Sequence, residues 1–210
     1  MIWEIFITGI ALEVLFLRWY FNWKGPMTKK EIEDFMEKFP ELPFSSNTDA
    51  GVIRQFLEED NGKDFCMANF ITLNKGKVKN PVTGESQDAL SGAQSYMKQI
   101  LPTLLKHGCH PVQQAYRVGG HIDTWGTEDK MEFPMLAMVR WRSRRDFAKI
   151  VAPSRPKGSK GALETKVSSM KNTLNVPIEI KVSLFMRPQY SVPLLILLMC
   201  CIAQIALTTI

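Results

Sequence analysis

Hydrophobic residues gather in two long runs, one near each end of the sequence. The first run, Ile2–Trp23, is interrupted by Glu4, Glu13 and Arg18 and finishes in an aromatic cluster followed by lysines. Its length suffices for a helix to cross a bilayer, and aromatic side chains are typical of the membrane–water interface. Charges are costly in lipid, so they indicate a face covered by protein or a helix lying partly at the interface. We expect residues 1–24 to form a membrane helix.

The second run, Val192–Ile210, carries no charge and has Lys181 and Arg187 on its inner flank. It predicts a second membrane helix over residues 190–210, the alternative being a buried helix of a soluble core. Basic residues flank both runs on the side of the central segment, and cytoplasmic loops carry such an excess. The pattern therefore predicts a protein of the inner or cytoplasmic membrane with its central domain on the cytoplasmic side.

The segment 25–62 predicts a helical linker. Thr28 followed by Glu31 is a capping-box pattern for a helix that continues to Phe39. Apolar positions spaced by three and four residues predict a second helix over Asp49–Glu59.

Residues 63–187 predict one α+β domain. Its strands are expected at 64–73, 111–118, 135–142 and 178–185, and its helices at 89–106, 143–151 and 162–174, with a polar loop over 74–87. This is the β-α-β-β-α-β order of a ferredoxin-like unit. A sheet with helices on one face leaves the other face uncovered, which favours the pairing of two sheets into a dimeric barrel.

The composition allows a sizeable core, with 45% hydrophobic and 22% charged residues. The net charge of +5 is concentrated between Arg140 and Lys160. The four cysteines have no framework-like spacing, so a reducing compartment is the simpler interpretation.

Three polar side chains on otherwise apolar elements are candidates for a pocket: Asn69, Tyr96 and Arg140. Period-two alternation places Asn69 on the same strand face as Met67 and Ile71. If that face lines a barrel, Asn69 would orient a ligand. The simpler interpretations are that the Asn69 amide bonds to neighbouring backbone, that Tyr96 is a core aromatic residue and that Arg140 forms a structural ion pair.

The basic segment offers candidates for contact with anionic lipid or an acidic partner: Arg142, Arg144, Arg145, Lys149, Arg155 and Lys157. Arg144 and Arg145 are expected on the exposed start of a helix, with Asp146 as a local partner. Interleaved aromatic residues are few, so no nucleic acid is expected. The cluster His107, Cys109 and His110 is explained by a helix end and a turn, so no metal site is predicted, and the sequence identifies no cofactor.

Three segments also carry a family resemblance: FCMANFITL at 65–73, SYMKQILPTLLKHG at 95–108 and MLAMVRWRSRRDFAKIV at 135–151. The chain from about Phe56 to Pro177 resembles the dimeric α+β barrel proteins catalogued as domain of unknown function 1330. The resemblance implies the fold but no single activity, because relatives of that barrel include monooxygenases, isomerases and haem proteins. The apolar runs and the helices before Phe56 are not part of that family domain. The segment 153–161 also departs from it, being rich in Lys, Gly and Pro.

The sequence thus favours a membrane-anchored interaction protein, an accessory or structural subunit of a larger bilayer complex. Its expected partners are other membrane-protein subunits and lipid, with a second copy of the chain as a further candidate. The alternative is a membrane-tethered enzyme, monooxygenase- or isomerase-like, acting on a small apolar or aromatic substrate in the barrel interior.

Overall fold

The computed structural model describes residues 2–42, 45–126, 133–152, 161–182 and 188–208. The chain divides into two compact units, each described here by itself. One comprises residues 24–179, and the other comprises residues 1–23 with 180–210.

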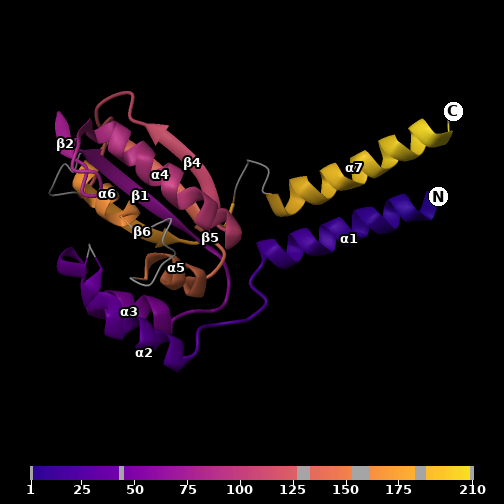
Figure 1. Ribbon diagram of the computed structural model, residues 1–210, viewed down its shortest axis with the longest axis horizontal. Helices are drawn as coiled ribbons and strands as arrows, with labels where there is room; N and C mark the ends of the chain where they lie inside the picture. The colour runs from indigo at the N-terminus through magenta and orange to yellow at the C-terminus, as the bar shows by residue number, and fades with distance from the viewer. Residues whose placement is uncertain (1, 43–44, 127–132, 153–160, 183–187, 209–210) are drawn as a thin grey trace. The chain divides into compact units, whose positions relative to one another are not determined.

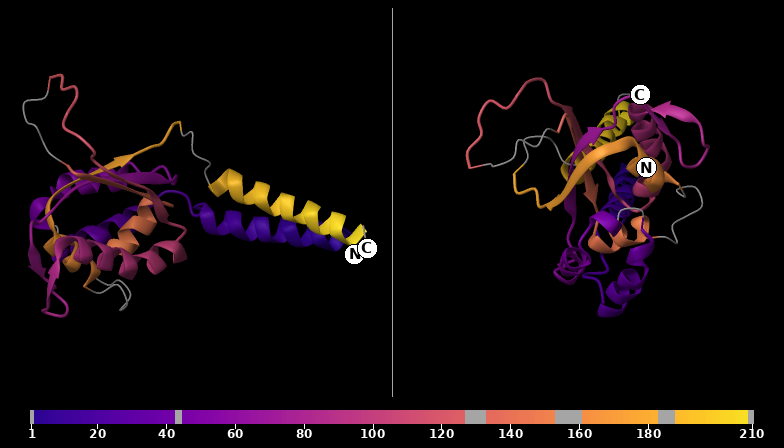
Figure 2. Two further views of the ribbon diagram at one scale, coloured as in Figure 1. Left: turned by 90° about the horizontal axis from the view of Figure 1, so that it is seen from above. Right: turned by 90° about the vertical axis from the view of Figure 1, so that its left-hand side faces the viewer.

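The central unit is a four-stranded sheet with helices on one face (Figures 1 and 2). The strands, in chain order, are β1 (Phe65–Leu73), β4 (His110–Tyr116), β5 (Met135–Trp141) and β6 (Met170–Ile178). The helices are α4 (Ala89–Lys106), α5 (Arg144–Val151) and α6 (Ala162–Ser169). The sheet order is β4-β5-β1-β6, and every neighbouring pair is antiparallel. The expected β-α-β-β-α-β order is confirmed.

Strand register separates the two faces of the sheet. Phe65 pairs with Trp141 and Met67 with Val139, and these residues belong to the core under the helices. Because side chains alternate along a strand, the residues between them point to the other face. On that open face Phe70 lies between Leu136 and Leu174, and the next row is Ala68 between Met138 and Val176. The open face is therefore largely apolar.

The segment before the sheet packs into the same core. It contains α2 (Lys29–Lys38), the short 3₁₀ turns η1 (Phe39–Glu41) and η2 (Ser45–Asn47), and α3 (Ala50–Glu58). The predicted capping box is present, since Thr28 and Glu31 each accept from the other's backbone N–H. Five buried residues of this segment belong to the same hydrophobic core as buried residues of β1, α4, β5 and α5. They are Ile32, Phe35, Phe39, Leu42 and Leu57.

The predicted last helix began at the correct residue but was too long, and the predicted last strand was placed too far along the chain. Helix α6 ends at Ser169, and β6 occupies Met170–Ile178 rather than 178–185. The hydroxyls of Ser168 and Ser169 both donate to the carbonyl of Thr165, satisfying the end of the helix. The alternating pattern runs through both segments, so it could not decide which of them pairs with β1. Residues 183–185 lie outside the described residues.

The predicted polar loop 74–87 instead holds a small hairpin. Strands β2 (Lys77–Lys79) and β3 (Ser86–Asp88) pair across a turn organised by Asn80. The Asn80 side-chain oxygen accepts from the backbone N–H groups of Val82 and Thr83 at 2.8 and 3.2 Å. Asparagine side chains commonly organise turns in this way.

Helices α4 and α6 approach closely at Gly92. A Cβ atom at this position would collide with the side chain of Ser169. Glycine therefore permits the contact that holds both helices on the same face of the sheet.

The other unit is a pair of antiparallel helices, α1 (Ile2–Tyr20) and α7 (Pro188–Thr208). At one end the Tyr20 hydroxyl donates to Gln189 Oε1 at 2.9 Å. Further along, Gly9 lies against Cys200, whose thiol lies 3.7 Å from the Ile5 carbonyl. Of the helices within the described ranges, α7 is long and apolar enough to cross a membrane, over Pro188–Leu207. The same is not evident for α1, because three charged residues interrupt it.

Adjacent leucines on α4 allow a matched test of the core. Leu104 is 2% exposed in the core and Leu105 is 42% exposed. We expect Leu104→Ala to lower the free energy of unfolding by about 2–5 kcal/mol, because it leaves a cavity. The matched variant Leu105→Ala should change it by less than about 1 kcal/mol. Urea unfolding of both variants checks this, and equal losses would contradict the packing.

Candidate functional site

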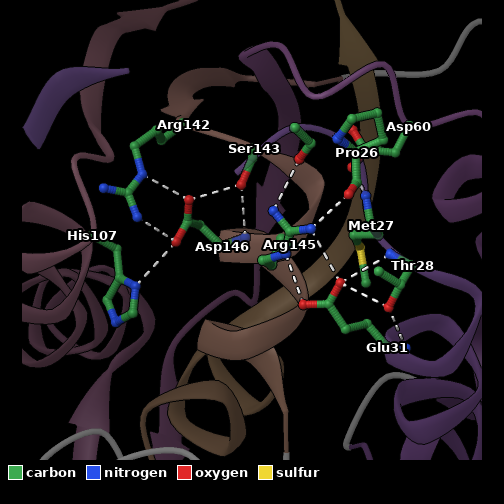
Figure 3. Close-up of polar contacts among 11 residues, drawn as sticks. Pro26, Met27, Thr28, Glu31, Asp60, His107, Arg142, Ser143, Arg145 and Asp146 are labelled. Carbon is green, nitrogen blue, oxygen red and sulfur yellow. Dashed lines mark hydrogen bonds and ion pairs between the residues drawn. The ribbon is translucent and has the colours of Figure 1, made fainter. Parts of the chain in front are cut away.

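Three residues of the predicted basic surface lie at the start of α5, Arg142, Arg144 and Arg145, and Figure 3 shows Arg142 and Arg145 with their partners. Ser143 is the N-cap residue, and its Oγ accepts from the Asp146 backbone N–H at 3.1 Å. The same hydroxyl donates to Asp146 Oδ2 at 2.7 Å. A serine at the cap followed by an acid in the first turn is a local helix-start signal. The cap therefore fixes the carboxylate of Asp146 at a defined place.

Asp146 is the centre of a buried charge cluster. Arg142 donates from Nε and Nη2 to its two oxygens, both at 2.8 Å, and His107 Nδ1 lies 3.2 Å from Oδ1. Burial alone would raise the pKa of Asp146, but hydrogen bonds from Arg142 and Ser143 hold the pKa below its ordinary value. The hydrogen bond to Asp146 raises the pKa of Arg142. The carboxylate is thus ionised and fully engaged.

The Arg145 side chain points away from Asp146, towards residues 25–31 at the start of the central unit. It is 6% exposed and donates from Nε to Glu31 Oε1 at 2.8 Å and from Nη2 to Oε2 at 3.1 Å. It also donates to the carbonyls of Gly25 and Pro26 at 2.9 and 2.6 Å. Hydrogen bonding to Arg145 lowers the pKa of Glu31 to about 2. The expected exposure of Arg145 is wrong, and its partner is Glu31 rather than Asp146.

Arg144 joins α5 to α3. Its Nη1 donates to the Phe56 carbonyl, its guanidinium lies 4.6 Å from the centre of the Phe56 ring, and its Nε is 4.0 Å from Asp60 Oδ1. Asp60 also accepts from the Met27 backbone N–H at 2.8 Å. Arg144 therefore packs inside the domain and is only partly exposed.

Three of the six proposed lipid or partner contacts are thus engaged inside the domain: Arg142, Arg144 and Arg145. Lys149 is exposed on α5. Arg155 and Lys157 lie outside the described residues. Contact of the three arginines with lipid would require these internal bonds to break.

The candidate pocket residues do not all lie on one side of the sheet. Asn69 is on the helix-covered face, and its amide donates to the carbonyls of Met67 and Ala137 at 2.9 and 3.0 Å. Tyr96 packs against the core on the same side. Arg140 pairs with Cys66 across the sheet and so points to the opposite face.

Arg140 forms the expected structural ion pair. Its Nε donates to Asp64 Oδ2 at 2.8 Å and its Nη1 to the Gly108 carbonyl at 2.8 Å. The simpler interpretations of Asn69 and Arg140 therefore agree with their contacts.

Tyr96 lies beside a lysine that sequence analysis missed. The Lys166 ammonium is 5.7 Å from the centre of the Tyr96 ring. Burial raises the pKa of Tyr96 to about 12 and lowers the pKa of Lys166 to about 8. The lysine was missed because it lies within a polar stretch of the predicted helix.

The residues of the H-x-C-H cluster point in different directions. His107 contacts Asp146, whereas His110 Nδ1 lies 3.0 Å from the Pro111 carbonyl. Cys109 is fully buried, and burial raises the pKa of its thiol to about 12. Across the described ranges, no three His, Cys, Asp or Glu side chains are grouped as metal ligands would be.

A groove of about 220 Å³ lies beside Arg144, where α3 meets the ends of β1 and β6. Its lining includes Phe56, Asn61, Lys63, Asp64 and Glu179. Ligand pockets are usually larger, about 300–1,000 Å³, and mostly apolar. The groove is therefore a poor fit to a small apolar substrate.

Comparison with known proteins adds support for the fold. No family model and no curated protein matches the chain. Two solved structures do: that of the methylated RPA0582 protein, and that of RPA0582, a protein of unknown function from Rhodopseudomonas palustris. The first is 14% identical with a TM-score of 0.52 and covers 66% of this chain and 96% of its own. The second is 13% identical with a TM-score of 0.52 and covers 65% and 96%. At such identity the likeness concerns the fold alone, and the resemblance to domain of unknown function 1330 stays a prediction.

The Glu31–Arg145 pair predicts a dependence of stability on acid. The folded pKa of Glu31 is about 2 and the model-compound value is 4.5, so the carboxylate contributes stability above about pH 5 that is lost towards pH 2. Glu31→Gln should lower the free energy of unfolding at pH 7 by about 1–2 kcal/mol, allowing for solvent screening, and by less at pH 3. Denaturant unfolding at both values measures this. Glu33→Gln on the same helix, in the exposed pair with Arg54, is the control and should change little. A pH-independent loss in Glu31→Gln would contradict the assignment.

Lys166 predicts a further dependence of stability on pH, at the alkaline end of the range. Between about pH 8 and 10.5 the unfolded chain binds more protons at this site, so stability contributed by the site rises with pH. Lys166→Met should therefore stabilise the protein at pH 7 by about 1–2 kcal/mol, with the advantage shrinking towards pH 10. Exposed Lys171→Met is the matched control. An advantage that stays constant with pH would show that desolvation of the ammonium is not its cause.

Proposed function

We propose that this chain is a membrane-anchored interaction protein, an accessory or structural subunit of a larger bilayer complex, with its central domain on the cytoplasmic side. The observation that carries this is the pair α1 and α7, whose apolar side chains are mostly exposed. On α1 they include Trp3, Ile7 and Ile10, at 77%, 63% and 63% exposure. On α7 eight leucine, isoleucine and methionine side chains are 44–62% exposed. Such a surface is unsuited to water and suited to lipid.

The two helices support membrane insertion of α1 as well as α7. They contact each other from Tyr20 and Gln189 to Ile5 and Cys200, so α1 would share the environment of its neighbour along its length. Close packing of small residues, here Gly9 and Cys200, is typical of helix association in membranes. Two crossings would place both ends of the described chain on the side away from the domain.

The domain supports an interaction role rather than catalysis. Its prominent polar groups bond to one another, as Asp146, Arg142 and Arg145 do, and the three pocket candidates do not converge on one cavity. The open sheet face is instead apolar and needs a covering partner. A second copy of the chain, giving a dimeric barrel, or another subunit would cover it.

The test is extraction of the full chain from its native membranes. Carbonate should leave the protein in the membrane, because both helices are embedded in lipid. Mild detergent should release a particle larger than one chain, measured by light scattering during size exclusion.

Two variants of β6 test the open face. Leu174 is 44% exposed there, so Leu174→Glu should reduce the particle mass. Thr173→Glu, one residue away and pointing to the opposite face, should preserve it. Release by carbonate, or a single-chain particle from the unaltered protein, would refute the proposal.

A further inference from the structure

Helix α1 carries a carboxylate near the middle of its apolar length. Glu13 lies on the half-buried side of α1 that also bears Gly9, Phe16 and Tyr20, the side that faces α7. In Figure 1 the two helices run side by side. Because the positions are three or four residues apart, they share one stripe of the helix. Glu13 therefore lies beside the seam between α1 and α7, near mid-depth of the proposed membrane pair.

Helix α7 supplies no charge to balance Glu13. Its residues Pro188–Thr208 are all uncharged, and the Gly9 and Tyr20 contacts place its central residues at the level of Glu13. With the described residues Glu13 forms no hydrogen bond or ion pair. An ionised carboxylate in the bilayer interior is expensive unless another group neutralises it.

A second copy of the chain cannot provide the missing cation. Two copies inserted in the same direction would bring Glu13 to the level of its own equivalent, which is a like charge. The cation of α1, Arg18, lies five residues further along, about 7.5 Å along the axis at 1.5 Å per residue. It also lies on a different side of α1, since its side chain is exposed.

We propose that Glu13 is the recognition point for a transmembrane helix of another protein, which carries a lysine or arginine within its apolar span. That helix would pack along the edge of the α1–α7 seam and form an ion pair with Glu13. Charge complementarity in lipid favours such a partner, because the unpaired carboxylate and the unpaired cation are each costly there. This inference rests on the proposed membrane role and adds the chemistry of the partner.

Photo-crosslinking of the full chain in native membranes tests it. A photoreactive residue at Leu17, one turn from Glu13 on the same side, should form a discrete adduct with a different protein. The sequenced partner peptide should be an apolar span containing a lysine or arginine. A probe at Leu15, which is 62% exposed and lies on the opposite side, should not form that adduct.

Charge dependence separates an ion pair from mere proximity. Glu13→Gln should lower the Leu17 adduct yield about tenfold, the change produced by about 1.4 kcal/mol. The matched control Glu4→Gln, near the other end of α1, should leave the yield unchanged.

Four outcomes would overturn the inference: no adduct, an adduct with a second copy, a partner span without a basic residue, or a yield unaffected by Glu13→Gln. Carbonate extraction of the same membranes distinguishes the two proposals. If the protein stays in the membrane and no adduct forms, the inference alone fails. If carbonate releases it, the proposed membrane role fails.

Discussion

The central domain is held together by one ion pair, in which buried Arg145 contacts the partly exposed Glu31. A guanidinium that is 6% exposed must have acceptors, and here two carboxylate oxygens and two backbone carbonyls provide them. The same Glu31 carboxylate accepts from Thr28 and so forms the start of α2. The pair therefore holds the backbone at Gly25 and Pro26, just before α2, and also joins α2 to α5. Because α5 also packs on β1 and β5 through Phe147, the pair links the first helices to the sheet.

This pairing changes what the net charge of +5 means. The arginines at the start of α5 form ion pairs with Asp146, Glu31 and Asp60 inside the domain. Among the described residues, exposed apolar side chains are numerous on the outer sides of α1 and α7, and the open sheet face adds Leu174. Partner choice would then rest on shape and apolar contact, with charge acting at a few defined points.

Local signals in the sequence were sufficient for elements whose ends are set nearby. The limits of α4 and α5 and the capping box of α2 were predicted correctly, to within one residue, because each depends on residues within a few positions. The last strand was misplaced because two successive segments alternate equally well, and only pairing with β1 selects the first. The partners of α5 were missed for a similar reason: Arg145 and Glu31 are 114 residues apart.

Two charged residues of the chain, buried Arg145 and half-buried Glu13, differ in how their charge is neutralised. In the domain, burying Arg145 is tolerable because folding brings Glu31 and two carbonyls to it. On α1, Glu13 has an uncharged neighbour in α7, and a parallel copy of the chain offers only a like charge at that level. Desolvation penalises an unpaired ion in either setting, and more severely in lipid. A charge that the chain itself does not neutralise is one that a different chain can recognise, so under the proposed membrane role Arg145 stabilises the fold of this chain whereas Glu13 would contribute to the choice of a partner.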